Sequence, residues 1–303
     1  MLHLDDLDVR IIKELGSPSS PQWNVRESYS NISRKLGVDE ETVRMRVKRA
    51  KERGFLPAWR MMVNPRLIGC EAAGLDLEVD DEERKAGVVS QITLVDGVTN
   101  LADFRGRGLS ATLYYENDES LGRKVRLIEA ICGGERSAMW KSFFPRPEVR
   151  MRRVDWMIVG ALREDARKDL EGVSKALGVS TRTVQRRLTA MKEGKAVYLS
   201  GAPNPDAVGG LMCNFLVFCP DPRKKRAADR MVYSMFRRIG GSDTSPEQYS
   251  TFGMSCENLA QADDVLSRLR SIDGVGSVRM RIMKRLIVVQ DWLKDEIEKR
   301  VAA

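Results

Sequence analysis

The chain contains one segment twice, about 141 residues apart, and this repeat constrains the fold more than any other feature. Residues 31–52 read NISRKLGVDEETVRMRVKRAKE and residues 172–193 read GVSKALGVSTRTVQRRLTAMKE, with 9 of 22 positions identical without a gap. Downstream, Asn64-Pro65 and Asn204-Pro205 each begin the sequence Asn-Pro-x-x-x-Gly. Self-similarity of this length is typical of a duplicated structural unit. We therefore expect two copies of one architecture.

Length and composition are those of a globular chain with more than one core. The 303 residues favour two or more domains, and 42% hydrophobic with 31% charged residues is typical of a soluble protein. No apolar run approaches the roughly 18 residues that a membrane span needs. The acidic, helix-patterned N-terminus is unlike a signal peptide. We expect a cytoplasmic protein with no membrane partner.

Cysteine and histidine usage argues against metal and histidine-based chemistry. The five cysteines are scattered without a CxxC pair, so we expect reduced, buried thiols rather than a disulfide framework or a zinc site. His3 is the single histidine, which argues against catalytic triads and proton shuttles. Gly133-Gly134 lacks the following Gly-Lys-Ser/Thr of a nucleotide-binding loop and is interpreted as a turn. We therefore expect no catalytic residue, no metal site and no cofactor.

The net charge of +8 is concentrated on the repeated segments. Residues 24–66 hold 11 Lys/Arg and 5 Asp/Glu, and residues 167–199 hold 8 and 3. The two stretches therefore carry +6 and +5, and the rest of the chain carries −3. One basic run is ordinarily a solvated face. Two such runs on the same repeated motif instead indicate a surface that binds a polyanion.

Each copy begins with a pattern of three helices. A polar stretch at 17–23 with two prolines ends the first helix of copy one, and a short second helix follows in each copy. Turns at Gly37 and Gly178 then lead to helices that Asp39 and Ser180 are expected to cap. This order is a helix-turn-helix with a leading support helix. The apolar stripes that mark the first helices are Leu4, Leu7, Ile11, Ile12 and Leu15, and Val154, Ile158 and Leu162.

Extended stretches at 55–63 and 196–202 follow the third helices, and we interpret them as the wings of winged helix-turn-helix domains. The shared Asn-Pro turn then leads to strand and helix patterns in alternation. In copy one these are strands 73–79, 99–104, 109–115 and 138–144 and helices 82–94 and 121–132. In copy two they are strands 214–219, 250–256 and 277–289 and helices 223–239 and 259–272. The order β-α-β-β-α-β is the ferredoxin-like split motif.

The predicted fold class is therefore α+β, with two winged helix-turn-helix domains and two ferredoxin-like (βαββαβ) domains in an internal repeat. Pro145-Arg146-Pro147 is predicted to be a stiff linker between the copies. A short amphipathic helix at 291–301 is expected to cap the second sheet. The domains, alternately helix-turn-helix and ferredoxin-like, are predicted at residues 1–66, 67–147, 148–206 and 207–303.

The third helix of each copy is expected to enter the major groove, because the second helix of a helix-turn-helix motif reads base edges. Core-facing apolar positions recur at i, i+4 and i+7: Val43, Val47 and Ala50 in copy one, and Val184, Leu188 and Met191 in copy two. The outward positions are then Glu41, Arg44, Met45 and Lys48, and Arg182, Gln185, Arg186 and Thr189. Arginine pairs with guanine and glutamine with adenine, so these side chains are suited to sequence readout.

Two residue types recur at matching positions of both reading helices. Arg46 matches Arg187 and Thr42 matches Thr183, so we assign these four to phosphate contact or helix support rather than to base choice. The full expected DNA-binding set is Thr42, Arg44, Met45, Arg46, Lys48, Arg49, Arg182, Thr183, Gln185, Arg186, Arg187 and Thr189.

The first turns of the two reading helices differ. Glu40 and Glu41 stand in copy one where Thr181 and Arg182 stand in copy two. Carboxylates suit the helix dipole but repel phosphates. We expect copy two to bind the DNA backbone more strongly and the unlike heads to read two unlike half-sites. If the heads sit as in a typical dimer, the half-sites lie about one helical turn, roughly 34 Å, apart.

The sequence resembles the Lrp/AsnC family of transcriptional regulators. The resemblance rests on LDDLDVRIIKEL, on LGVDEETVRMRVKRAKERGFL and on IDGVGSVRMRIMKRLIVV. It implies winged helix-turn-helix domains that bind double-stranded DNA, and ferredoxin-like domains that dimerise and often bind amino acids. Members of the family have one such unit of about half this length and assemble into dimers and higher oligomers. The chain thus resembles a fused pseudo-dimer, and a homo-oligomer is expected.

The turn associated with effector binding departs from the family pattern. Many members carry a Gly-x-x-Asp-like turn after the second strand of the sheet domain. This chain has Phe104-Arg105-Gly106-Arg107-Gly108 and Phe252-Gly253-Met254-Ser255 there, and neither supplies the aspartate. We therefore carry over no effector-contacting residue, and a small-molecule effector other than an amino acid stays open.

A sequence-specific DNA-binding regulator, not an enzyme, is the leading hypothesis. An architectural protein that binds DNA nonspecifically is the first alternative, since the basic charge alone allows it. Siroheme decarboxylases resemble this family in fold and use histidine and arginine beside a tetrapyrrole, and a chain whose only histidine is His3 is a poor match. A ligand-sensing adaptor without DNA binding is disfavoured because both reading helices keep their caps and arginines.

Overall fold

The structure, a computed structural model, describes residues 2–15, 26–56, 59–201, 203–236, 239–245 and 247–302. Copy one runs through α1 (Asp6–Leu15), α2 (Tyr29–Leu36), α3 (Glu40–Glu52), β1 (Trp59–Val63), the short helix η1 (Pro65–Ile68), β2 (Glu71–Glu78), α4 (Lys85–Ile92), β3 (Val98–Phe104), β4 (Gly108–Tyr115), α5 (Asp118–Cys132) and β5 (Ala138–Ser142).

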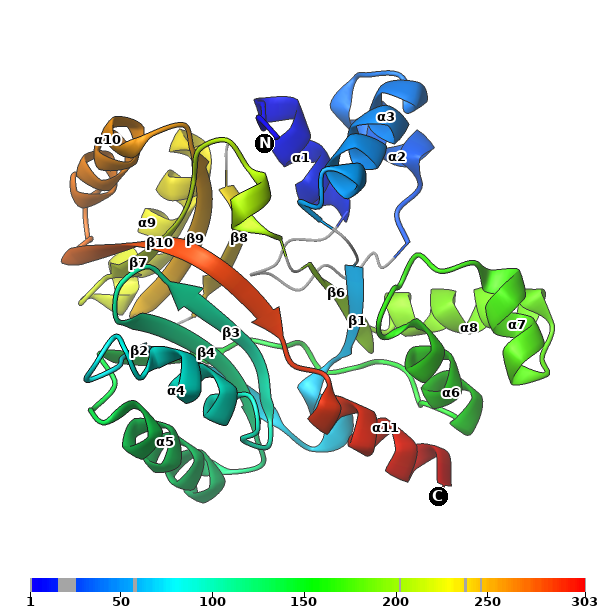
Figure 1. Ribbon diagram of the computed structural model, residues 1–303. Helices are drawn as coiled ribbons and strands as arrows, with labels where there is room; N and C mark the ends of the chain where they lie inside the picture. The colour runs from blue at the N-terminus through cyan, green and yellow to red at the C-terminus, as the bar shows by residue number, and fades with distance from the viewer. Residues whose placement is uncertain are drawn as a thin grey trace.

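Copy two repeats this order and adds one helix (Figure 1). The α+β class, with paired helix-turn-helix and ferredoxin-like units, is confirmed. The predicted borders at 66 and 206 fall within the two short helices η1 and η2. Its elements are α6 (Arg153–Leu162), α7 (Leu170–Leu177), α8 (Thr181–Glu193), β6 (Val197–Gly201), η2 (Pro205–Ala207), β7 (Leu211–Phe218), α9 (Pro222–Met235), β8 (Ile239–Thr244), β9 (Tyr249–Cys256), α10 (Leu259–Arg270), β10 (Ser277–Val288) and α11 (Asp291–Ala302).

The turns between the second and third helices form as predicted. Gly37 and Gly178 end α2 and α7 in the left-handed conformation, at φ 69° and 66°, which glycine adopts without steric cost. Ser180 caps α8, since its hydroxyl accepts the N–H of Thr183. Asp39 stands at the corresponding place before α3 but accepts no backbone N–H, so the predicted capping bond is wrong there. The proline-containing stretch at 17–23 lies outside the described residues.

The predicted wings do not form as hairpins. Each copy supplies a single strand, and β1 pairs antiparallel with β6, from Trp59 opposite Gly201 to Val63 opposite Val197. Both strands are buried over nearly their whole length. A strand that is apolar on both faces needs cover on each side, so a pairing between the copies replaces two exposed wings.

One long strand joins the two ferredoxin-like units into a single eight-stranded sheet. The strand order is β5-β2-β4-β3-β10-β7-β9-β8, with four strands from each copy. The first half of β10 pairs with β7 of its own copy, and the second half pairs with β3 of the other. The sequence prediction missed β8 and extended the preceding helix to 239, whereas α9 ends at Met235. The glycines of IGGSDT hide the strand pattern, and pairing with β9 makes it a strand.

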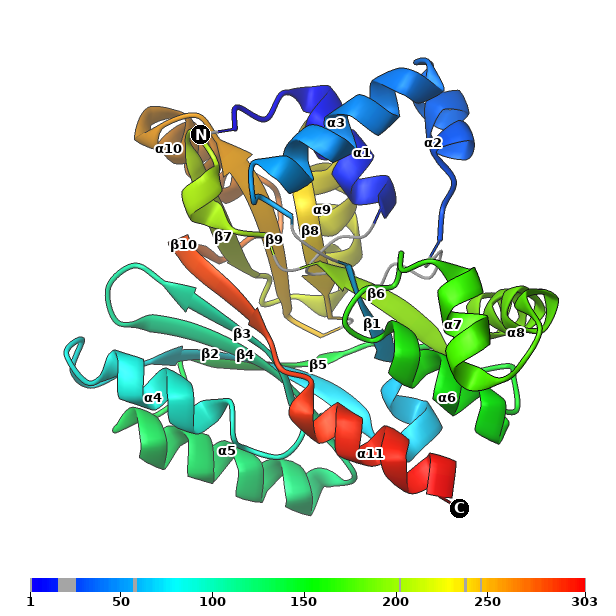
Figure 2. The same ribbon diagram turned by 45° about the vertical axis from the view of Figure 1, so that its right-hand side comes forward.

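Helices cover the outer face of each half of the sheet (Figure 2): α4 and α5 over copy one, α9 and α10 over copy two. Side chains alternate across each strand, so Leu109 and Leu113 of β4 pack under α4 and α5 while Thr112 points to the inner face. The inner faces of the two halves meet. The indole of Trp140 in β5 donates to Asp243 in β8, 2.8 Å apart, although these strands are the two ends of the sheet.

The helical heads cross between the copies. α1 of copy one packs against β8 of copy two, and Leu2 forms a parallel bridge with Val208. α11 packs on α6 rather than on the second sheet, so the predicted cap is corrected. The cause is β10, whose second half lies beside β3 and therefore carries the chain to the second head. There Leu293 and Ile297 are buried in the core that both heads share.

The helices and the cysteines bear on the predictions about membrane spans and thiols. Within the described residues, each helix is too short or too polar to cross a membrane. All five cysteines are free and buried, as predicted. Burial raises the pKa of the Cys70 and Cys132 thiols to about 11, which keeps them protonated and unreactive near neutral pH.

Candidate nucleic-acid interface

α8 presents a polar face to solvent. Val184, Leu188 and Met191 are buried against the head, as the spacing predicted. The positions between them point outward, and within the described part of the chain no side chain or backbone group pairs with them. These exposed positions are Arg182, Gln185, Arg186 and Thr189.

Arg187 lies on the opposite side of α8 and serves the fold. Its guanidinium forms a buried, two-pronged ion pair with Asp155 of α6, whose side chain is fully buried. The hydrogen bonds that Arg187 donates to the Asp155 carboxylate raise the pKa of Arg187. Of the two roles left open for this residue, helix support is therefore the one that the structure assigns. Arg187 is removed from the DNA-contacting set because a buried guanidinium cannot reach a phosphate.

Arg46, the equivalent arginine of α3, also forms ion pairs with aspartates but is less buried than Arg187. Arg46 pairs with Asp5 at 2.6 Å and Asp8 at 2.9 Å, and Arg49 pairs with Asp8 at 2.8 Å. These two acids lie at the start of the chain, at and just before α1. Arg46 and Arg49 thus tie α3 to α1, and contact of either residue with DNA remains a prediction. The sequence signal was present, since LDDLDVR places acids at a spacing that brings both to α3.

The outward cations of α3 are also paired. Arg44 lies 2.7 Å from Glu40 and 3.3 Å from Glu41, and Lys48 lies 3.8 Å from Glu52. Met45 is the apolar exception, with 54% of its surface exposed. The outward face of α3 is therefore close to neutral. The outward face of α8, in contrast, carries the charges of Arg182 and Arg186, which have no partner among the described residues.

The hydroxyls of the two threonines at matching positions are held within the turn. Thr183 shares a hydrogen bond with the Ser180 hydroxyl at 2.9 Å, and the Thr42 hydroxyl donates to Asp39 at 3.2 Å. Both threonines are half-buried. Their shared role is to hold the first turn of the reading helix, and phosphate contact remains a prediction.

A contact between the two heads was not foreseen. Arg26, just before α2, donates to the carbonyls of Ala166 and Lys168 at 2.6 and 3.1 Å, and Arg167 donates to the Glu27 carbonyl. The Tyr29 ring lies 5.0 Å from the Arg167 guanidinium. These residues are 140 positions apart and their acceptors are backbone carbonyls, so no residue pattern marks the contact.

Comparison with known proteins identifies the family. The AsnC-type helix-turn-helix domain matches residues 4–51 and 151–192, which contain the two heads. An HTH-type transcriptional regulator of Pyrococcus furiosus is 39% identical over 141 residues, which is 45% of this chain and 91% of that relative. The chain belongs to the AsnC-type family of helix-turn-helix transcriptional regulators. Somewhat less than half of this AsnC-type chain thus corresponds to nearly the whole relative.

Two further similarities bear on the extent of the match. The HTH-type transcriptional regulator Ptr1 of Methanocaldococcus jannaschii is 36% identical over 72 residues, so this AsnC-type chain spans only 45% of the length of Ptr1. The crystal structure of the siroheme decarboxylase NirDL aligns over 98% of this chain and 99% of its own, with a TM-score of 0.56 and 14% identity. At that identity the likeness shows a shared fold alone.

Proposed function

We propose that this AsnC-type regulator binds double-stranded DNA through two unlike heads, with α8 as the stronger one. The observation that carries the proposal is the exposed face of α8, where Arg182, Gln185 and Arg186 have no partner within the described residues. Unpaired guanidinium groups at the start of a reading helix are suited to guanine edges and phosphates, and glutamine to adenine. Because Arg182 and Arg186 form no ion pair among the described residues, binding of α8 to DNA breaks none.

The head built on α3 is proposed to read a different half-site with lower backbone affinity. Glu40 and Glu41 hold Arg44 and place negative charge where phosphates approach. Met45 offers an apolar contact in the position that Arg186 takes in α8, and apolar side chains contact the thymine methyl group. The target is therefore an asymmetric bipartite site.

The head-to-head contact supports simultaneous binding of both half-sites. Arg26 and Arg167 bond each head to the backbone of the other, and β1 and β6 form a ribbon beneath them. Heads held in one arrangement favour half-sites at one constant spacing, which is about one helical turn, roughly 34 Å, if the heads sit as in a typical dimer. Nonspecific binding rests on basic charge alone and gives no reason for two unlike reading faces, which α3 and α8 have.

We propose that the chain is not an enzyme, although it shares its fold with a siroheme decarboxylase. The cavity between the two half-sheets has a volume of about 100 Å³, below the roughly 300–1,000 Å³ typical of ligand pockets. His3, the only histidine in the sequence, lines a larger and more open pocket of about 930 Å³ together with Arg49. The proposal rests on the lack of a second histidine in the sequence to share acid–base chemistry with His3. Purified protein that carries a bound tetrapyrrole would overturn this proposal.

We also propose that the chain forms a homo-oligomer. Leu94 and Leu127 stand exposed on the helical layer of copy one, with 80% and 51% of their surfaces accessible. Exposed apolar side chains can become buried when two chains associate. Sedimentation velocity should show a particle larger than one chain, and exclusively monomeric protein at high concentration would contradict the proposal.

The test of DNA binding is a selection from sheared genomic DNA at physiological salt, followed by sequencing of the retained fragments. A retained motif with two unlike halves supports the proposed function and defines the sites. Uniform retention would favour the architectural alternative. The absence of retention would refute both and favour the adaptor.

A further inference from the structure

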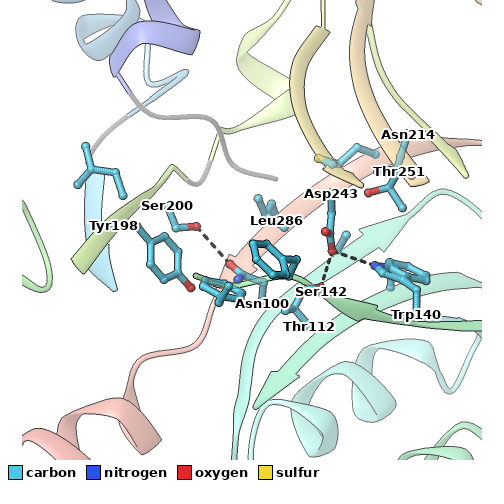
Figure 3. Close-up of a pocket in the computed structure, with 16 residues that line it drawn as sticks. Asn100, Thr112, Trp140, Ser142, Tyr198, Ser200, Asn214, Asp243, Thr251 and Leu286 are labelled. Carbon is cyan, nitrogen blue, oxygen red and sulfur yellow. Dashed lines mark hydrogen bonds between the residues drawn. The ribbon is translucent and has the colours of Figure 1, made fainter. Parts of the chain in front are cut away.

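The inner faces of the two half-sheets enclose a cavity that DNA binding does not use. Its volume is about 100 Å³, and strands of both copies line it together with β6 (Figure 3). Packed sheet faces usually meet through apolar side chains. Here about half of the described lining residues are polar, among them Asn100, Thr112, Asn214, Asp243 and Thr251.

Asp243 is the one charged residue in the described lining, and its orientation is fixed. Its Oδ2 accepts hydrogen bonds from the Trp140 indole at 2.8 Å and from the Ser142 hydroxyl at 2.6 Å. Asp243 lies in β8 of copy two and both donors lie in β5 of copy one, so the carboxylate is held at the cavity by a contact between the copies (Figure 3). Within the described residues, Oδ1 accepts no hydrogen bond and no lysine or arginine forms an ion pair with Asp243.

A second carboxylate between the two half-sheets, that of Asp76, is paired with arginines of the protein. Asp76 is buried and pairs with Arg279 and with Arg281, the latter at 3.0 Å. Burial raises the pKa of both Asp76 and Asp243, so each charge is costly without a counter-ion. Asp76 has two such partners from the protein. Asp243 forms no ion pair among the described residues. The ammonium group of Lys225 lowers the pKa of Asp243 through space but is itself bonded to Asp229, 2.6 Å away, which leaves Oδ1 of Asp243 open to a cation from outside.

The volume of the cavity and its other lining residues indicate which kind of cation it can hold. An engineered cavity of about 150 Å³ takes benzene, so about 100 Å³ suits a molecule of roughly four heavy atoms. Met283 and Leu286 supply an apolar wall. No lysine or arginine lines the described cavity to receive a carboxylate, which disfavours an amino acid.

We propose that this cavity binds a small primary alkylammonium ion, with the ammonium group on Asp243 and the alkyl group against Met283 and Leu286. An ammonium group has three N–H donors, of which one is assigned to Oδ1 of Asp243, and the lining supplies further oxygen acceptors such as the hydroxyl of Thr251. The site takes residues from both copies, so its occupation links the two half-sheets.

Calorimetric titration of the full chain with n-propylammonium chloride, in the absence of DNA, tests the proposal separately from DNA binding. We expect one saturable site per chain. Asp243→Asn removes the charge and keeps an oxygen for the β5 donors, so it should weaken binding about tenfold or more. Asp263→Asn, an exposed acid on α10, is the matched control for net charge and should leave the affinity unchanged.

Three outcomes would overturn the proposal. The first is equal affinity in the Asp243→Asn variant, with melting curves showing that it is folded. The second is binding of 1-propanol or of alanine as strong as that of n-propylammonium, which would remove the ammonium specificity. The third is full competition by potassium, which would make this an inorganic ion site. If Asp243→Asn does not fold, Ser110→Leu fills the cavity from β4, and unchanged binding in that variant would equally exclude the site.

Discussion

At the scale of single residues, acidic neighbours decide which arginines of the reading helices remain available. Arg187 and Arg46 occupy the same position in the repeat, and each is held by aspartates of the preceding support helix region. Arg44 is held on its own helix by glutamates. Arg186 has no such neighbour among the described residues. Position in the helix therefore gives the direction of each side chain, and the partner determines whether its charge is free.

Replacement of Arg186 by alanine should weaken binding to the selected site by ~1–3 kcal/mol and relax one base position. Arg44→Ala is the matched control on the other head, and its effect should be smaller because Glu40 and Glu41 already hold that guanidinium. Fluorescence anisotropy on the selected site and on single-base variants measures both. A uniform loss on every sequence would make Arg186 a phosphate contact.

Replacement of Arg187 by methionine should destabilise the second head by about 3–5 kcal/mol, because it leaves the fully buried Asp155 without a counter-charge. Arg46→Met is the control, with an expected loss of about 1 kcal/mol or less, since its pair with Asp5 is more exposed and Arg49 still binds Asp8. Urea unfolding followed by circular dichroism gives both values. Equal small losses would mean that the buried pair adds no stability.

At the scale of elements, equivalent helices differ in their first turn, and equivalent strands find partners in the other copy. α3 and α8 bury matching apolar positions, yet only α3 begins with carboxylates. β1 and β6 pair with each other. Element type thus follows the repeat, whereas surface charge and pairing follow the local environment.

Exchange of Glu40-Glu41 for Thr-Arg, the residues that begin α8, should raise nonspecific DNA affinity. The exchange removes two repelling charges, adds one cation and releases Arg44 from its ion pairs. The slope of log affinity against log salt on random DNA should become steeper. The reverse exchange at Thr181-Arg182 should lower both quantities, and unchanged affinity in either variant would refute the repulsion argument.

At the scale of the whole molecule, the copies are interlocked rather than placed side by side. The strands β1 and β3 of copy one pair with β6 and β10 of copy two, and α11 at the end of the chain packs on α6. Each connection satisfies backbone groups or apolar surface that a separate copy would expose to water.

Residues 1–147 and 148–303 expressed separately should therefore fail to form stable monomers. Expressed together they should assemble into a complex of one each, since all pairings between the copies are then restored. Size-exclusion chromatography and amide hydrogen exchange report the result. A separate half with a cooperative unfolding transition as a monomer would show that the pairings across the copies are dispensable.

Much of the candidate interface was determined by local sequence. Val184, Leu188 and Met191 at helical spacing fix which face of α8 is buried, and hence that Arg182 and Arg186 point outward. Gly37 and Gly178 fix the turns for a steric reason that acts within a few residues. The repeat gave the order of elements because each copy carries the same local patterns.

Only the tertiary structure decided the partners. Whether an arginine is free or neutralised depends on an acid that arrives from another element, as Asp155 does for Arg187. The strand pairing of β1 with β6, the place of α11 and the carboxylate of Asp243 at a cavity all depend on contacts between residues about 100 or more positions apart. Periodicity in a sequence reports which face of an element is buried, because burial acts on each element separately. It does not report what covers that face, which the packing of the whole chain determines.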